Sequence, residues 1–163
     1  MDSFKDITTF KVGGPIARIV RVGSAEEFVH AVAELKSKNE KFLIVGGGSN
    51  LLPHDDGFEG TVVIPTFTDI VCKDELMTAE AGASWDELVD RAIAQGLWGI
   101  ENLSGIPGTV GGAVVANIGA YGAALSDTLV SVAVYDTRTA SRTTMVRDQC
   151  GFGYRASIFK QHP

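Results

Sequence analysis

The sequence predicts an α+β fold in which strands outnumber helices. Three observations indicate this class. A β-α-β unit of the usual length lies near the start of the chain. The second half contains short strand-like segments without regular alternation of strand and helix. A hairpin pattern near its end has a mostly polar turn at 137–140 between two strand-like runs.

The β-α-β unit occupies residues 16–45. Two strand-like runs, IARIVRV at 16–22 and FLIV at 42–45, enclose a helical pattern. Ser24 and Glu27 form a capping box, after which apolar residues recur at helical spacing. The helix is therefore expected to begin just after Ser24.

The rest of the chain predicts short strands and one further helix. A second capping box, Ser84 with Glu87, predicts a helix whose C-terminal end Gly96 would cap. The predicted strands are TVVIP (61–65), DIVC (69–72), MTAEAG (77–82), LVSVAVYD (129–136) and TTMV (143–146).

Composition restricts the classes of partner. The chain of 163 residues fits one domain or two small subdomains that share a core. Its net charge of −6 argues against nucleic-acid and acidic-membrane partners. No segment approaches the roughly 18 apolar residues of a membrane span, and MDSFKDITTF lacks the apolar core of a signal peptide. Cys72 and Cys150 lie far apart, which is typical of reduced thiols in a cytoplasmic protein.

Two glycine-rich segments are the candidate binding loops. In VGGGSN (45–50), three glycines let successive N–H groups point into one concavity, which suits an anion, and Ser49 and Asn50 add donors. A glycine-rich turn without a ligand is the alternative. The segment does not open a helix as a dinucleotide fingerprint should, because LLPHDDG follows, and no P-loop motif is present.

The second segment is ENLSGIPGTVGGAVVANIGAYG (101–122). It has six glycines, too many for a comfortable helix, and is too irregular for a strand and too apolar for a solvated linker. Residues 102–126 contain no charged side chain, so a phosphate held here would depend on backbone N–H groups. Two such loops suggest a large cofactor whose pyrophosphate is clamped from both sides, as in a flavin dinucleotide. A tightly packed structural loop is the alternative.

Other chemistry has little support. His54, Asp55 and Asp56 are adjacent, which is typical of a solvated turn, and no metal site is predicted. Ser104 and the three histidines form no hydrolase motif.

Five segments resemble the UDP-N-acetylenolpyruvoylglucosamine reductase (UDP-N-acetylmuramate dehydrogenase) family, in the family's order. They are TTFKVGG (8–14), GGGSNLL (46–52), AGASWDELV (81–89), ENLSGIPGTVGGAVVANIGAYG (101–122) and GYRASIFK (153–160). The resemblance implies an FAD-binding domain of the vanillyl-alcohol-oxidase (PCMH) type with two α+β subdomains. Residues 1–66 would form a small β-α-β FAD-binding subdomain and residues 67–163 an incomplete, larger strand-rich one. The C-terminal substrate domain would be absent.

The resemblance also implies which residues surround the flavin. They belong to the first glycine loop, the 81–83 turn and the second glycine segment. They are Gly46, Gly47, Gly48, Ser49, Asn50, Ala81, Gly82, Ala83, Ser104, Gly105, Ile106, Pro107, Gly108, Thr109, Gly111, Gly112, Asn117, Ile118 and Gly122. Covalently flavinylated relatives of this fold often have a histidine in the first loop, where this chain has Ser49, so FAD is expected to be non-covalent.

The reaction that the family implies is NADPH-dependent reduction of a nucleotide-sugar enolpyruvate, UDP-N-acetylglucosamine enolpyruvate, to UDP-N-acetylmuramate in cytoplasmic peptidoglycan precursor synthesis. Arg155 matches the arginine beside the substrate carboxylate, where a fixed cation stabilises developing charge. Tyr154 and Lys160 are expected to contact the substrate or to pack near it. Ala116 and Ala124 depart from the family, which usually has Gln and Glu there.

Family members are about twice as long and supply a serine proton donor and a late glutamate from a C-terminal region. Neither has a counterpart among these 163 residues, so the chain is expected to need the remainder of its own enzyme for turnover. The alternatives are a non-catalytic flavin-binding module and another flavin oxidoreductase on the same scaffold.

Overall fold

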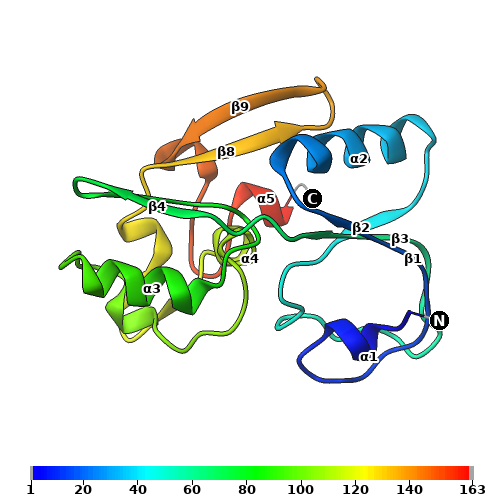
Figure 1. The fold of residues 1–163 in the computed structure, drawn as a ribbon, viewed down its shortest axis with the longest axis horizontal. Coiled ribbons are helices and arrows are strands. Elements are labelled where there is room, and N and C mark those ends of the chain that lie inside the picture. The colour runs from blue at the N-terminus through cyan, green and yellow to red at the C-terminus, as the bar shows by residue number, and fades with distance from the viewer. Residues whose placement is uncertain (1, 162–163) are drawn as a thin grey trace.

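The computed structural model describes residues 2–161 and shows two adjoining halves (Figure 1). The first half holds α1 (Phe4–Ile7), β1 (Ile16–Val22), α2 (Ala25–Ser37), β2 (Phe42–Ile44) and β3 (Phe58–Pro65). The second half holds β4 (Ile70–Lys73), β5 (Leu76–Ala79), α3 (Trp85–Ala94), α4 (Val110–Ala116), β6 (Gly119–Ala120), β7 (Ala123–Ala124), β8 (Ser131–Asp136), β9 (Ser141–Val146) and α5 (Ile158–Gln161). It also contains three 3-10 helices, η1 (Glu101–Leu103), η2 (Leu125–Asp127) and η3 (Arg147–Cys150).

The first half is built on a parallel sheet in the order β1-β3-β2. The predicted β-α-β unit is present, with β3 between its two strands: Val20 of β1 pairs with Val63, and Leu43 of β2 pairs with Val62. Val62 and Val63 are fully buried because apolar side chains cover both faces of this central strand. α2 packs through Leu35 against one of these faces.

Ser24 and Ser84 cap α2 and α3 as predicted, but within residues 2–161 neither glutamate carboxylate accepts from the N–H of its cap serine, so the boxes are incomplete. Ser24 Oγ accepts a hydrogen bond from the Glu27 N–H (3.1 Å), and Ser84 Oγ accepts one from the Glu87 N–H (3.4 Å). In the first box, the Glu27 carboxylate accepts from the N–H of Gly23 (2.7 Å). These side chains satisfy N–H groups that have no partner within the helix.

The second half is made of antiparallel pairs, β4–β5, β6–β7 and β8–β9. The hairpin predicted around residues 137–140 is confirmed, with Asp136 opposite Ser141. The strand predicted over 77–82 is wrong at its end. It stops at Ala79 because a turn follows, in which the Ala83 N–H donates to the Glu80 carbonyl (3.0 Å). No helix among residues 2–161 has the length and apolar character required to cross a bilayer.

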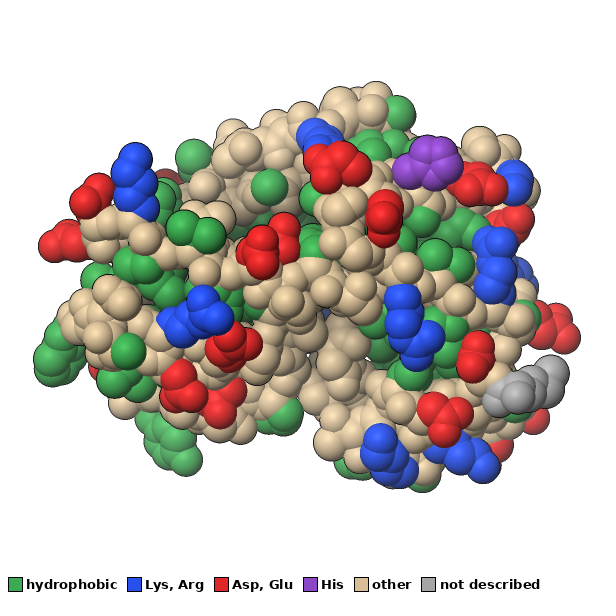
Figure 2. Space-filling view, in the orientation of Figure 1, with side chains coloured by type: hydrophobic (Ala, Val, Ile, Leu, Met, Phe, Trp, Pro, Cys, Tyr) green, Lys and Arg blue, Asp and Glu red, His purple; other side chains and the backbone are tan. Residues whose placement is uncertain are grey.

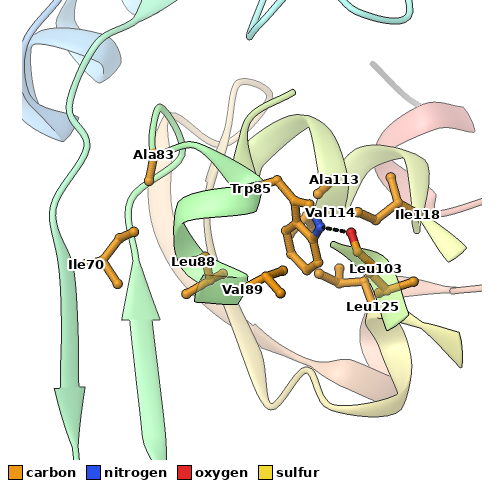
Figure 3. Close-up of a cluster of buried hydrophobic side chains, with 10 residues drawn as sticks. All are labelled: Ile70, Ala83, Trp85, Leu88, Val89, Leu103, Ala113, Val114, Ile118 and Leu125. Carbon is orange, nitrogen blue, oxygen red and sulfur yellow. Dashed lines mark hydrogen bonds between the residues drawn. The ribbon is translucent and has the colours of Figure 1, made fainter. Parts of the chain in front are cut away.

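A separate core fills the second half (Figure 3). The indole of Trp85 is 1% exposed and lies among side chains of α3, α4 and η1, and its Nε1 donates to the Leu103 carbonyl oxygen (2.9 Å). The hydrogen bond fixes η1 against α3. Residues 101–103, the start of the second glycine segment, are therefore anchored in the core.

Replacing Trp85 by phenylalanine should lower the free energy of unfolding by about 2 kcal/mol or more. The smaller phenyl ring leaves a cavity where the indole packs, and the buried Leu103 carbonyl loses its donor. Chemical denaturation followed by circular dichroism measures the change. The matched control is Trp98→Phe, because Trp98 is 85% exposed, and its midpoint should not move. Equal midpoints for both variants would contradict the role given to the hydrogen bond.

The expectation that glycine excludes a helix from residues 101–122 is wrong at α4. Its two glycines cost about 2 kcal/mol relative to alanine, but a local cap and long-range contacts offset this cost. Thr109 caps the helix by accepting from the Gly112 N–H, Val114 is buried in the core, and Ser157 Oγ donates to the Val115 carbonyl (2.6 Å). Tertiary packing thus overrides local propensity.

Candidate functional site

The two predicted glycine loops lie side by side at the junction of the two halves. A Cβ placed on Gly47 would be 3.1 Å from the Cα of Gly108, and Ser49 Oγ donates to the Pro107 carbonyl (3.0 Å). At this contact the loops leave no space between them for a pyrophosphate. At this contact the two loops form one continuous surface.

The first loop presents unused hydrogen-bond donors. The N–H of Val45 is bonded to the Val63 carbonyl (3.0 Å) and anchors the start of the loop. Within residues 2–161, the N–H groups of the next five residues, Gly46 to Asn50, donate to no protein acceptor. Gly48 has a φ of +63°, and a Cβ there would collide with the Ile7 carbonyl. Consecutive free N–H groups in a tight glycine turn are a typical anion-binding arrangement.

The 81–83 turn is fastened to the start of α4. The N–H of Gly111 donates to the Ala81 carbonyl (2.9 Å), and the N–H of Val110 donates to the Ala83 carbonyl (2.9 Å). A Cβ on Gly111 would lie 3.1 Å from the Ala81 carbonyl oxygen. Gly111 therefore allows close backbone packing, and the three predicted segments form one connected wall.

Asp86 organises the start of the second loop and was not predicted as a site residue. Its Oδ1 accepts from Ser104 Oγ (3.1 Å) and from the N–H of Gly105 (2.7 Å). Gly105 has a φ of +75°, with open space where a Cβ would point. The sequence shows Asp86 only as an ordinary acidic residue in the first turn of a helix, so it gives no signal for this contact.

Asn117 and Ile118 lie in the interior. Asn117 is 5% exposed, its Nδ2 donates to the Gly153 carbonyl (2.9 Å), and its Oδ1 accepts from the Ser126 N–H (3.1 Å). Ile118 packs in the core of the second half. Gly122, in contrast, is exposed at the tip of the β6–β7 hairpin.

Arg155 lies on an exposed turn beside that hairpin. Its Nη2 donates to the Gly119 carbonyl (2.7 Å), and no carboxylate among the described residues lies within ion-pair distance. Lys160 Nζ donates to the Arg155 carbonyl (3.2 Å), and Tyr154 is 96% exposed. The guanidinium therefore keeps donors available for an external carboxylate.

The surface near the loops is open. Figure 2 shows a face hollowed between the two halves, where backbone and uncharged side chains predominate. Two cavities lie elsewhere: one of about 610 Å³ borders α1 and includes Lys5 and Lys11, and one of about 260 Å³ includes Asp127 and Arg147. Neither is lined by a predicted site residue.

Comparison with known proteins gives consistent results. A family profile described as "FAD binding domain" matches residues 16–143. The UDP-N-acetylenolpyruvoylglucosamine reductase of Thermobifida fusca is 43% identical over 161 residues, which cover 95% of this chain and 45% of that protein. The enzyme of the same name from Tropheryma whipplei (strain Twist) is 43% identical over 164 residues, covering 98% of this chain and 46% of that protein. The chain thus spans about half the length of the curated relatives it matches.

Solved structures show the same fold. The crystal structure of UDP-N-acetylenolpyruvylglucosamine reductase from Thermus caldophilus aligns with a TM-score of 0.81 at 33% identity, covering 96% of this chain and 55% of that one. Cholesterol oxidase from Brevibacterium sterolicum aligns with a TM-score of 0.63 at 18% identity, covering 78% of this chain and 29% of that one. The fold expected from the sequence, α+β of the PCMH type, is confirmed.

Proposed function

Because the chain belongs to the FAD binding domain family, we propose that it is the flavin-binding portion of an NADPH-dependent UDP-N-acetylenolpyruvoylglucosamine reductase. The observation that carries this proposal is the match of nearly the whole chain to enzymes of that name. The first loop agrees with it, since its five consecutive N–H groups, which donate to no acceptor among residues 2–161, suit the pyrophosphate of FAD. The proposal places the reaction in cytoplasmic peptidoglycan precursor synthesis.

The connected wall would hold the cofactor where the two halves meet, between residues 1–66 and 67–163. The N–H groups of 46–50 would bind the pyrophosphate, and the uncharged 104–112 segment would lie along the phosphates and the flavin. The 81–83 turn supports this segment through its bonds to α4. Ser49 donates to the Pro107 carbonyl and carries no imidazole, so the attachment proposed for FAD is non-covalent.

Bound FAD supplies hydride transfer, from NADPH to the enolpyruvyl double bond of the substrate. Arg155 would bind the substrate carboxylate with guanidinium donors that pair with no carboxylate of residues 2–161. As hydride adds to the double bond, negative charge develops toward that carboxylate, and a fixed cation stabilises it. Tyr154 and Lys160 would flank the substrate. The proton donor would come from the remainder of the enzyme.

Titrating the apo chain with FAD tests the cofactor proposal. Flavin fluorescence should change and then reach a plateau, since the first loop offers one defined set of N–H donors for the pyrophosphate. After denaturation and filtration, all flavin should pass into the filtrate. Flavin retained by the denatured protein would contradict non-covalent attachment, and a strictly linear titration would contradict the site. A second experiment tests the activity. The complete enzyme should reduce UDP-N-acetylglucosamine enolpyruvate, and the flavin-loaded 163-residue chain without the remainder of the enzyme should not.

A further inference from the structure

The turn that carries Arg155 has an unfavourable backbone conformation. Gly153 and Ala156 exchange two backbone hydrogen bonds (3.0 and 3.1 Å), which leaves Tyr154 and Arg155 as the central residues of a tight turn. Arg155 has a φ of +53°. A side chain with a Cβ disfavours this left-handed region, and such residues persist where the surrounding structure enforces them.

Side chains on both sides of the turn enforce this conformation. Asn117 Nδ2 donates to the Gly153 carbonyl (2.9 Å) at the start of the turn. Lys160 Nζ donates to the carbonyl of Arg155 itself (3.2 Å). Just after the turn, the fully buried Ser157 donates through Oγ to the Val115 carbonyl (2.6 Å) and ties this segment to α4.

Among these side chains, Asn117 bonds to two separate segments of the chain. It follows α4 with a φ of +43°, and its own N–H donates to the Val114 carbonyl (3.1 Å). The side-chain amide uses its oxygen for the Ser126 N–H and its nitrogen for Gly153. With 5% exposure it joins three segments: the end of α4, η2 and the turn.

We propose that Asn117 is a positioning residue for Arg155: its Nδ2 bond to the Gly153 carbonyl holds the turn and thereby fixes the guanidinium. The first part, that Asn117 holds the turn, concerns this chain alone. The second part, that Asn117 affects reduction of the substrate, rests on the proposed function, in which the guanidinium binds the substrate carboxylate. The two parts are tested by separate measurements.

Trypsin measures how firmly the turn is held, because cleavage after Arg155 requires the turn to open locally. In Asn117→Asp the oxygen bonded to Ser126 is retained and the donor to Gly153 becomes an acceptor. Cleavage of the Arg155–Ala156 bond should accelerate about tenfold, while cleavage after Arg138, in the exposed turn of the β8–β9 hairpin, keeps its rate. Asn117→Gly, which tolerates the left-handed conformation, should show the same increase.

Asn39→Asp is the matched control, because Asn39 also has a left-handed backbone (φ +53°) and takes no part in the turn. Its cleavage after Arg155 should equal that of the unmodified chain. Unchanged cleavage after Arg155 in both Asn117 variants would overturn the proposal. Equal acceleration after Arg155 and Arg138 would also overturn it, since that pattern indicates general destabilisation.

A double-mutant cycle in the complete flavin-loaded enzyme tests the link to the guanidinium. Asn117→Asp should slow reoxidation of the flavin by the enolpyruvyl substrate about tenfold. In an Arg155→Ala background the same substitution should have less than a twofold effect, because its target is gone. An equal effect in both backgrounds would overturn the positioning role. A complete enzyme that reduces no enolpyruvyl substrate would overturn the proposed function and leave the trypsin result standing.

Discussion

Arg155→Ala in the complete reductase is expected to slow reoxidation of the flavin by the enolpyruvyl substrate by about 10² to 10³. This range is typical for the loss of one preorganised charge-stabilising donor. FAD binding and flavin reduction by NADPH should be little changed, because Arg155 bonds to the second glycine segment only at the Gly119 carbonyl, outside residues 46–50, 81–83 and 104–112. Alanine retains a Cβ, so the backbone preference at this left-handed position is little altered. Stopped-flow absorbance of the flavin resolves the two half-reactions.

Two further substitutions identify the chemistry behind this effect. Arg155→Lys should also be impaired, since an ammonium cannot form two parallel hydrogen bonds to a carboxylate. Arg138→Ala is the matched control, because Arg138 is an exposed arginine that pairs with Asp136 in the β8–β9 hairpin. Its reoxidation rate should equal that of the unmodified enzyme. Equal slowing of both half-reactions in Arg155→Ala would indicate general damage, and normal reoxidation would remove Arg155 from the mechanism.

The elements that the sequence predicts well depend on local interactions. Ser24 and Ser84 cap helices through bonds that reach three residues along the chain, so a short pattern is enough to identify both helix starts. The strand at 16–22 agrees with β1 because its β-branched residues pack on both sides of a pleated surface. Periodicity and capping therefore predict where these elements begin, and the order of the sheet follows from longer-range pairing.

Long-range contacts account for what the sequence does not predict. The glycine content of residues 110–116 argues against a helix, and only Ser157, 42 residues from Val115, and the buried core reveal why α4 forms. The bonds from Asp86 to Ser104 and from Asn117 to Gly153 join residues 18 and 36 positions apart. The residue types in the glycine loops indicate an anion site. The contact between the two loops depends on the fold and cannot be predicted from those residue types.

Gly47→Val is the second substitution expected to have a large effect, a loss of FAD affinity of tenfold or more, which is about 1.4 kcal/mol. The Cβ would lie 3.1 Å from the Cα of Gly108, and the branches of valine extend farther, so the two loops must separate. Separation moves the free N–H groups of 46–50 relative to the second loop. Gly111→Val should act in the same direction by displacing the Ala81 backbone, which lies 3.1 Å from its Cβ position.

The control for Gly47→Val is Gly23→Val, because a Cβ on Gly23 meets only the Glu27 carboxylate, at 3.6 Å, and touches neither glycine loop within 4 Å. FAD titration of each folded variant, monitored by flavin fluorescence, gives the dissociation constants, and circular dichroism confirms folding. If Gly47→Val folds and binds FAD as tightly as the Gly23→Val control, the glycines serve loop packing alone. Weaker binding by Gly47→Val with an unchanged unfolding midpoint would instead show that the contact between the loops sets the geometry of the phosphate site. The structure favours this second result, because the residues that touch across the loops directly adjoin the N–H groups of 46–50, for which the described part of the chain supplies no acceptor.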